Sequence, residues 1–343
     1  MSMMIGRRTV STGLAAFGAG LYPRGASAQN AELEAAARKE GAVTWYTAHT
    51  DVESAEAAGR GFTAKYPEIK VTVIRTTAQV AYQRLLQDLK NNVANCDVFS
   101  STDLGHDEAL SRQGKFAKYT PLGADRMLPD FQNFDPKGFY YPTTAELCVL
   151  LHNTAKVKPA EAPTQWQDLV DPKWKNQVTV GHPGFSGTVG TWVVTMRDLY
   201  GWSFFERLER NKPLIGRSVN DAVTTLNSAE RLVAMGSAGL ATVTAARGNP
   251  IGVTNPSDGA VLVVSPSAVM INAPHPNAAR LFMDYLVGPD HAAVMAAAAR
   301  VTVCATPVGG ALPAGAKILR PTVAQIVKGI PEVIEQWRDL FGN

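Results

Sequence analysis

Three short segments of this chain place hydroxyl and imidazole groups directly after apolar runs of strand composition. They are residues 47–50, 100–103 and 181–188. In an open α/β sheet, ligands bind beyond the carboxyl ends of the strands, where loops and helix N-termini converge. Hydroxyl and imidazole groups at such positions suit a small, oxygen-rich ligand. We therefore take these three segments as the candidate binding loops.

The third segment, Gly-His-Pro-Gly-Phe-Ser-Gly-Thr at residues 181–188, has the composition of an anion site. It follows a strand-like run and precedes a predicted helix, so free backbone N–H groups and the positive end of the helix dipole would face a ligand. Its glycines permit a close approach of the backbone. The predicted contacts here are His182, Ser186, Gly187 and Thr188. A helix cap that binds no ligand is the alternative interpretation of the same pattern.

The first two segments supply polar side chains of the same kind. A solvated loop is the alternative for residues 47–50, although the position at a strand end favours function. In the second segment, Asp103 is expected to cap the next helix. The predicted ligand contacts from these two segments are Thr47, His49, Thr50, Ser101 and Thr102.

Catalytic and metal-binding signatures are missing from the sequence. It contains no GxSxG elbow, no HExxH, no P-loop and no GxGxxG. The group Asp103, His106, Asp107 and Glu108 has the spacing of a solvated helix start rather than of a metal site. We therefore predict no catalytic residue, no resident metal and no cofactor. An enzyme built on the same frame stays an alternative, for which we find no nucleophile–base pair.

The elements that must position these loops alternate between strands and helices. Strand-like runs lie at residues 43–47, 69–74 and 97–100, and helical patterns lie at 31–39, 53–66 and 80–89. This β-α-β-α-β order predicts a parallel sheet with helices on its faces. A second series follows, with helices at 166–170, 188–200 and 221–235 and a strand at 178–180. The fold class predicted from this order is α/β.

Two apolar regions without a helical period separate the two series, at residues 139–153 and 261–264. We interpret them as crossings between two lobes, because 343 residues exceed one ordinary domain. The predicted first lobe comprises residues 29–142 and 262–300, and the predicted second lobe comprises residues 143–261. Residues 301–343 are expected to form C-terminal helices, which we assign to neither lobe.

The N-terminus has the features of an export signal. Arg7 and Arg8 precede a mildly apolar stretch, and Ala26-Ser27-Ala28 matches a cleavage site, so residues 1–28 are the predicted signal peptide. The paired arginines favour twin-arginine export, with the ordinary Sec route left open. Either route predicts a periplasmic protein.

Charge and cysteine content restrict the partners. Without the three arginines of residues 1–28, the chain has 30 basic and 30 acidic residues. A neutral mature protein offers neither a nucleic-acid footprint nor a polybasic membrane patch. Cys96, Cys148 and Cys304 form no CxxC motif. They are expected to be three buried free thiols, with one disulfide as the alternative.

Several longer motifs resemble one family. Residues 41–50, 62–67, 96–98, 162–174 and 273–282 look like segments of family 1 extracellular solute-binding proteins, in the ferric-iron-binding-like branch. The resemblance runs in order from Gly41 to Val294. It implies a two-lobed periplasmic-binding-protein fold with two interlobe crossings, and ligand capture in the cleft by hinge closure. It also implies a monomeric receptor that delivers a small molecule to the permease subunits of an ABC importer.

The sequence departs from the iron-binding members of that branch. These relatives hold ferric iron through adjacent tyrosines in the second lobe, after a helix that corresponds to residues 228–235. Residues 239–247 here read Gly-Leu-Ala-Thr-Val-Thr-Ala-Ala-Arg, without a tyrosine. Fe³⁺ prefers hard anionic oxygen ligands, which threonine and alanine do not supply. Tyr140 and Tyr141 are adjacent, but they lie in the first crossing and are expected to pack the hinge.

An anionic solute is therefore the expected ligand, with ferric iron as the alternative. The Ser-Gly-Thr sequence at residues 186–188 resembles the loop with which relatives grip phosphate or phosphonate groups. Arg247 is predicted as a further partner of the anion, and an exposed surface arginine is the alternative interpretation of that residue. The expected ligand class is a phosphate ester, a phosphonate or a carboxylate.

Overall fold

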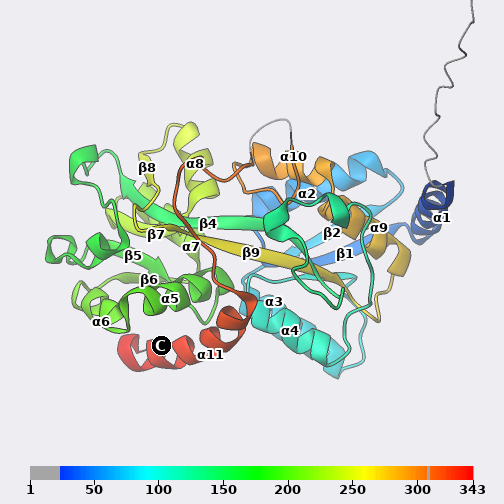
Figure 1. Cartoon of the computed structure of the whole chain (residues 1–343), viewed down its shortest axis with the longest axis horizontal. Coiled ribbons are helices and arrows are strands. Elements are labelled where there is room, and N and C mark those ends of the chain that lie inside the picture. The colour runs from blue at the N-terminus through cyan, green and yellow to red at the C-terminus, as the bar shows by residue number, and fades with distance from the viewer. Residues whose placement is uncertain (1–23, 307–309, 343) are drawn as a thin grey trace, which may run out of the picture.

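The computed structural model describes residues 24–306 and 310–342, which form a mixed α/β structure (Figure 1). The α-helices are α1 (Arg24–Glu40), α2 (Val52–Lys65), α3 (Ala78–Lys90), α4 (Leu104–Arg112), α5 (Gly187–Tyr200), α6 (Ser203–Arg210), α7 (Val219–Asn227), α8 (Ala238–Ala246), α9 (Pro276–Leu286), α10 (Pro289–Ala297) and α11 (Val323–Phe341). The strands are β1 (Ala42–Thr47), β2 (Lys70–Arg75), β3 (Val98–Ser100), β4 (Tyr141–Asn153), β5 (Val178–Gly181), β6 (Leu214–Gly216), β7 (Val233–Ser237), β8 (Ile251–Thr254), β9 (Ala260–Val269) and β10 (Ile318–Leu319).

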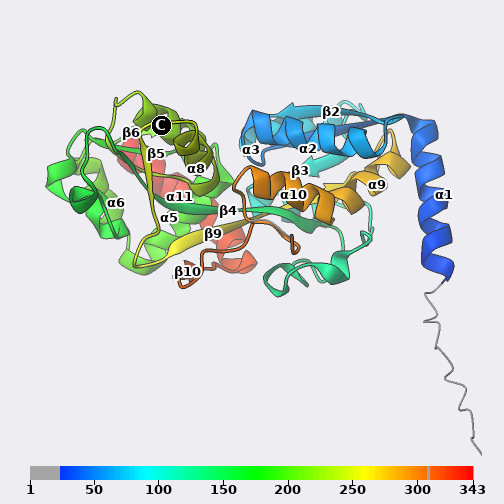
Figure 2. The ribbon, with the colours of Figure 1, turned by 90° about the horizontal axis from the view of Figure 1, so that it is seen from above.

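The first lobe has the predicted β-α-β-α-β order. Strand β1 pairs in parallel with β2 on one side and with β3 on the other. Helix α2 packs on β2, and α9 and α10 return to the same lobe, where α10 packs against α2 and α9. Aromatic rings fill this core, with Phe62 packed against Phe282 at 5.0 Å between ring centroids. Helix α1 stands at the outer end of the lobe, beside α9 (Figure 2).

Strands β4 and β9 run between the two lobes as an antiparallel pair (Figure 1). Strand β9 pairs with β3 near its C-terminal end, whereas β4 pairs with β7 through residues 148–152. The strand order β2-β1-β3-β9-β4-β7-β5-β6 therefore makes one continuous sheet through both lobes. The predicted crossing at residues 139–153 is a single strand of 13 residues, and the return crossing is longer than the four residues expected.

The second lobe corrects one predicted element. The expected helix at residues 221–235 ends at Asn227, and Val233–Ser237 is the buried strand β7, which pairs with β4 and β5. Ala229, at φ 57°, takes the chain out of the helical conformation. A short apolar run buried on both faces cannot be told from helix by its periodicity, which is why the pattern misled. Residues 228–235, which were matched to a helix of the iron-binding relatives, thus form a turn and the start of a strand.

The C-terminal region contains a single α-helix in its described part. Helix α11 packs against α5 and α6 of the second lobe and against α4 of the first (Figure 1). Before it, Val301 bridges to Ala145 of β4, and β10 pairs with β9. The chain thus passes between the lobes a third time, beside the two predicted crossings.

All three cysteines are buried free thiols, as the first of the two interpretations expected. The predicted signal peptide lies outside the described residues except for its last five, which belong to α1. Cleavage after Ala28 therefore stays a prediction. Within residues 24–306 and 310–342, no helix combines the length and the apolar character that crossing a membrane requires.

Candidate functional site

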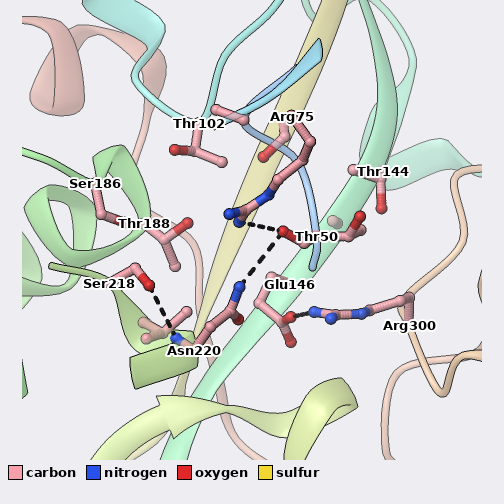
Figure 3. A pocket seen from close by; sticks show the side chains of 14 residues that line it. Thr50, Arg75, Thr102, Thr144, Glu146, Ser186, Thr188, Ser218, Asn220 and Arg300 are labelled. Atoms are coloured by element: carbon pink, nitrogen blue, oxygen red, sulfur yellow. Dashed lines mark hydrogen bonds and ion pairs between the residues drawn. The ribbon is translucent and has the colours of Figure 1, made fainter. Parts of the chain in front are cut away.

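A cavity of about 40 Å³ lies between the lobes (Figure 3). Its wall in the first lobe follows the C-terminal ends of β1, β2 and β3, and its wall in the second lobe consists of the first residues of α5 and α7. The crossing strands and the segment after α10 complete it. The lining residues are Ala48, Thr50, Arg75, Thr102, Thr144, Ala145, Glu146, Ser186, Thr188, Ser218, Val219, Asn220, Ser265 and Arg300.

Four of the ten predicted contacts line this cavity. Thr50 and Thr102 come from the first lobe, and Ser186 and Thr188 come from the second. Ser186 is the N-cap of α5, where its hydroxyl accepts the Val189 N–H at 3.4 Å. The structure therefore brings together residues from all three predicted segments.

Four other predicted residues lie behind the cavity wall and support it. The Thr47 hydroxyl accepts the His49 N–H at 3.1 Å, and His49 Nε2 lies 3.3 Å from the Ser101 carbonyl oxygen. Burial lowers the pKa of His49 to about 3, so its imidazole is neutral. In the second lobe, His182 Nδ1 accepts the Gly184 N–H at 2.9 Å and shapes the turn before α5. These side chains hold the loops rather than face the cavity.

Gly187 lies where the two lobes approach each other closely. A Cβ at this position would lie 2.2 Å from the carbonyl carbon and oxygen of Thr102 and 2.3 Å from the Asp103 nitrogen. Real Cβ atoms essentially never come under 3.0 Å. The sequence predicts that this glycine lets a ligand approach the backbone. In the structure it admits the backbone of the opposite lobe.

Arg247 is placed away from the cavity. It follows α8 and forms an ion pair with Glu53 of α2, with 2.7 Å between Nη2 and Oε1. Both side chains are more than half exposed. Because the pair lies on the surface between α2 and α8, Arg247 has the exposed position that the alternative interpretation described.

Arg75 is a charged lining residue that the sequence analysis did not identify. It ends β2, and its guanidinium points toward Thr188 and Asn220 of the opposite lobe (Figure 3). Its Nη2 donates to the Thr50 carbonyl oxygen, and no carboxylate of the described residues lies within ion-pair distance of it. Burial lowers the pKa of Arg75 somewhat, but an arginine stays charged in proteins. Its position at the carboxyl end of a strand is the feature of the sequence from which it could have been predicted.

The start of α7 is the second missed feature. Ser218 is its N-cap and accepts the Asn220 N–H at 3.3 Å, while Asn220 Nδ2 donates to the Thr50 carbonyl oxygen at 3.5 Å. The first N–H groups of a helix lack partners within the helix, and the dipole is positive there. Two helix N-termini, of α5 and α7, therefore face the same cavity.

The other arginine at the cavity is neutralised by acids. Arg300 pairs with Asp51 at 2.6 Å and with Glu146, and it also donates to the Ser237 hydroxyl at 3.0 Å. Arg300 is 3% exposed. Arg75 is thus the lining arginine that forms no ion pair within the described residues, while the carboxylates of Asp51 and Asp221 favour its charge from a longer distance.

A cluster with the residue types of a hydrolytic triad lies behind Thr102. Ser101 Oγ is 3.0 Å from His106 Nδ1, and His106 Nε2 is 3.6 Å from Asp103 Oδ2. However, Ser101 is fully buried and its hydroxyl accepts the Asp103 N–H at 3.0 Å. The His106 ring stacks on Tyr82, with 4.0 Å between centroids. These contacts are those of a capped helix start, not of an accessible nucleophile.

The same helix start corrects a second expectation. His106 is 8% exposed and Asp107 is fully buried, so this face of α4 is not solvated as its spacing indicated. Asp103 caps α4 as expected, since its carboxylate accepts the Gly105 N–H at 2.8 Å. No group of three His, Cys, Asp or Glu residues within the described chain is arranged to hold a metal ion. Tyr140 lies away from the cavity, where its hydroxyl donates to Glu108 at 2.6 Å.

Solved structures with the same fold bind chemically different ligands. One is the periplasmic binding protein AfuA from Actinobacillus pleuropneumoniae with fructose-6-phosphate, at TM-score 0.78 and 22% identity over 88% of this chain and 98% of that one. Another is iron-bound HitA from Pseudomonas aeruginosa, at TM-score 0.71 and 19% identity over 87% and 99%. A periplasmic thiamin binding protein follows at TM-score 0.74 and 19% identity over 88% and 96%. At these identities the likeness shows a shared fold.

Sequence comparison identifies the family. An uncharacterised protein of Haemophilus influenzae is 21% identical over 267 residues, which cover 75% of this chain and 76% of that protein. The family described as bacterial extracellular solute-binding protein matches residues 95–328, which include both crossing strands and the whole second lobe. With its two-lobed fold and its interlobe cavity, the chain belongs to this family of bacterial extracellular solute-binding proteins.

Proposed function

We propose that this protein is the periplasmic receptor of an ABC importer and captures a small anionic solute between its lobes. The observation that carries the proposal is the position of Arg75. Its guanidinium forms no ion pair among the described residues and points at two helix N-termini of the opposite lobe. An anion placed there would receive charge-assisted hydrogen bonds from both lobes. The ligand class is a phosphate ester, a phosphonate or a carboxylate.

Hinge closure accounts for the size of the cavity. Its volume of about 40 Å³ has room for roughly three water molecules, since each needs about 10–15 Å³ on this measure. A phosphate ester is several times larger. Ligand uptake in this proposal therefore requires the lobes to separate and then to close around the solute with a wider spacing than in this structure.

The hinge is assigned to one irregularity in the crossing strands. The register of β4 against β9 shifts between Pro142 and Thr144, and Pro142 faces Pro266. Proline has no N–H, so the ladder between the two strands is interrupted on both sides at this point. We accordingly place the first lobe boundary at residue 142, as the sequence predicted, and the second near residue 265 instead of 261.

The chemistry of the cavity favours an anion over the other ligands of the structural neighbours. Ferric iron needs anionic oxygen ligands, and no tyrosine is among the lining residues. Thiamin carries a positive charge, which the guanidinium of Arg75 would repel. A phosphorylated ligand such as that of AfuA fits the same donors. Ferric iron stays the second candidate because iron-bound HitA shares the fold.

Export and binding without turnover complete the proposal. The acid-free leader and its Ala-Ser-Ala site support processing after Ala28 and a periplasmic location. The buried position of Ser101 supports binding without catalysis. The importer's permease subunits are the proposed partners of a monomeric receptor.

The decisive experiment replaces Arg75. We expect isothermal titration with a panel of phosphate esters, phosphonates, carboxylates, thiamin and ferric citrate to find binding only among the anions. Arg75→Gln should weaken the best ligand by at least about 30-fold, because truncating a buried charge pair costs about 2–5 kcal/mol. Arg75→Lys should retain part of the affinity, since lysine keeps the charge but not the planar fork.

Lys70→Gln is the matched control, because it removes a cation from the other, exposed end of β2. Its affinity should equal that of the unmodified protein. Tight iron binding that is insensitive to Arg75→Gln would refute the anion proposal and establish the ferric alternative.

A further inference from the structure

Arg300 is a buried cation whose partners come from both lobes. It follows α10, a helix of the first lobe, and its N–H bonds to the Met295 carbonyl oxygen at 2.9 Å. Its guanidinium pairs with Asp51, the N-cap residue of α2 in the same lobe. The other end of the guanidinium reaches Glu146 on β4 and Ser237 at the start of α8. One side chain thus spans the boundary between the lobes.

The second lobe is shaped to receive this side chain. At Gly239, the second residue of α8, a Cβ would lie 2.7 Å from Arg300 Cδ and 2.9 Å from its Nε. Any larger residue would displace the arginine from the α8 N-terminus. The contact is therefore a fitted interface rather than a chance proximity of two charges.

Each side of this contact has its own internal partners. Asp51 stays beside Arg300 within the first lobe, at 2.6 Å. Glu146 accepts the Ser237 hydroxyl at 2.6 Å and the Leu147 N–H at 3.0 Å within the second. Breaking a buried ion pair is costly when it strands a charge without compensation. Here separation leaves an Arg300–Asp51 pair on one side and a hydrogen-bonded Glu146 on the other. The adjacent Ala145 N–H bond to the Val301 carbonyl oxygen, at 3.4 Å, must also break for the contact to open.

We propose that Arg300 is the closure latch of this receptor, a positioning residue that holds the lobes together through Glu146 and Ser237. The latch rests on the hinge closure of the proposed function, but not on the identity of the ligand. Asp51 is the resting partner that keeps the guanidinium charged and oriented when the lobes part. The latch therefore adds to the closed state an attraction that the bound solute does not provide.

The test measures the distance between the lobes without added ligand. Spin labels at Lys90→Cys and Glu209→Cys report on the two lobes, and the native cysteines are buried and so protected from labelling. In this background, Glu146→Gln removes the negative charge and one of the two accepting oxygens but keeps the size of the side chain. We expect its open-to-closed ratio to rise by about tenfold, because a hydrogen bond between charged groups is lost.

Asp51→Asn is the contrasting variant. It weakens the pair within the first lobe and leaves Arg300 with Glu146, so the lobes should stay as closed as in the unmodified protein. A merely structural role for the cluster would make both variants equally unstable and would leave the distance distribution unchanged. Arg300→Lys keeps a charge at the same place and should give an open fraction between the two extremes.

The exposed pair Arg247–Glu53 is the matched control, because it also joins α8 to α2 but lies in solvent. Glu53→Gln should leave the distances unchanged. If Glu146→Gln and Arg300→Lys both keep the unmodified distribution, the latch is refuted while hinge closure stands. If no variant and no tested ligand changes the distance, hinge closure itself is refuted together with the latch.

Discussion

The two walls of the cavity would attract the proposed anion by different physical means. The first lobe contributes a formal charge on a long side chain, Arg75 at the end of β2. Apart from Glu146, whose charge is paired with Arg300, the second lobe contributes two helix N-termini, each capped by a serine, at Ser186 and Ser218. A side-chain charge acts over several ångströms and adapts to its partner. Backbone N–H groups act only at contact, and the helix holds them in a rigid arrangement.

This difference indicates a division of labour between the lobes. Arg75 can attract an anion to the open cleft, because its charge does not depend on the position of the other lobe. The N-termini of α5 and α7 gain contact with the same anion only when the lobes close. The second lobe would then determine the shape of ligand that is bound, and the first lobe would determine that the ligand is negatively charged. The three predictions that follow test this comparison, in order of decreasing effect.

The largest effect is expected where the walls touch. Gly187→Ala places a methyl group at 2.2 Å from the Thr102 backbone, which cannot move aside unless the lobes separate. Alanine suits the first turn of α5, so each lobe should keep its fold. We expect affinity for the ligand to fall by at least about 100-fold, since the closed state becomes a minor population. Titration calorimetry measures this loss.

Gly190→Ala is the control within the same helix. Its Cβ would meet only methyl and methylene groups of Ile330, at 3.1–3.3 Å. Gly190→Ala changes the packing within the second lobe but not the contact between the lobes. Its affinity for the ligand should therefore be close to that of the unmodified protein. Unimpaired binding by Gly187→Ala would show that the second lobe recognises the solute without closing on the first.

A smaller effect concerns acid stability, which we expect to be limited by the first lobe. Burial lowers the pKa of His49 to about 3 and of His291 to about 4, and both lie in that lobe. Their unfolded pKa is about 6.5, so below this pH the unfolded chain binds protons that the folded lobe does not. Stability is therefore complete above pH 6.5 and is lost as the pH falls toward 4.

The loss at pH 5 is about 2 kcal/mol for each histidine, at 1.36 kcal/mol per pH unit. Denaturant unfolding at pH 7 and pH 5 measures it. His291→Gln keeps a donor for the Leu286 carbonyl oxygen and should reduce the difference between the two pH values by about half. An unchanged pH dependence in this variant would show that the acid-sensitive groups lie elsewhere.

The smallest effect separates single hydroxyl groups on the two walls. Thr188→Val and Thr102→Val each remove one lining hydroxyl without removing a helix cap. A hydrogen bond to a charged ligand contributes about 1.5–3 kcal/mol, so Thr188→Val should weaken binding by at least about tenfold. If the second lobe determines the geometry of recognition, Thr102→Val should reduce the affinity for the ligand less than Thr188→Val does. The reverse order would overturn the division of labour.

The sequence by itself determined the fold class and three of the segments that line the cavity. Local signals sufficed there, because strand ends, helix caps and glycines are determined by residues a few positions apart. Thr50, Thr102, Ser186 and Thr188 were found in this way. Arg75 is the last residue of β2, so its position at a strand end could also have been recognised from the sequence. The strand at Val233–Ser237 could not be recognised in this way, because its burial on both faces removes the alternation of apolar and polar residues that reveals a strand.

Only the tertiary structure decided which polar residues face the cavity and which support it. Thr47, His49 and Ser101 have the same residue types and spacing as the lining residues, yet their hydrogen bonds run inward. Arg300 and Glu146 are 154 positions apart, and Gly187 meets Thr102 across the lobe boundary. Such pairings depend on how two lobes pack against each other. Local sequence patterns contain no information on that packing, because the contacts join segments that the chain itself keeps far apart.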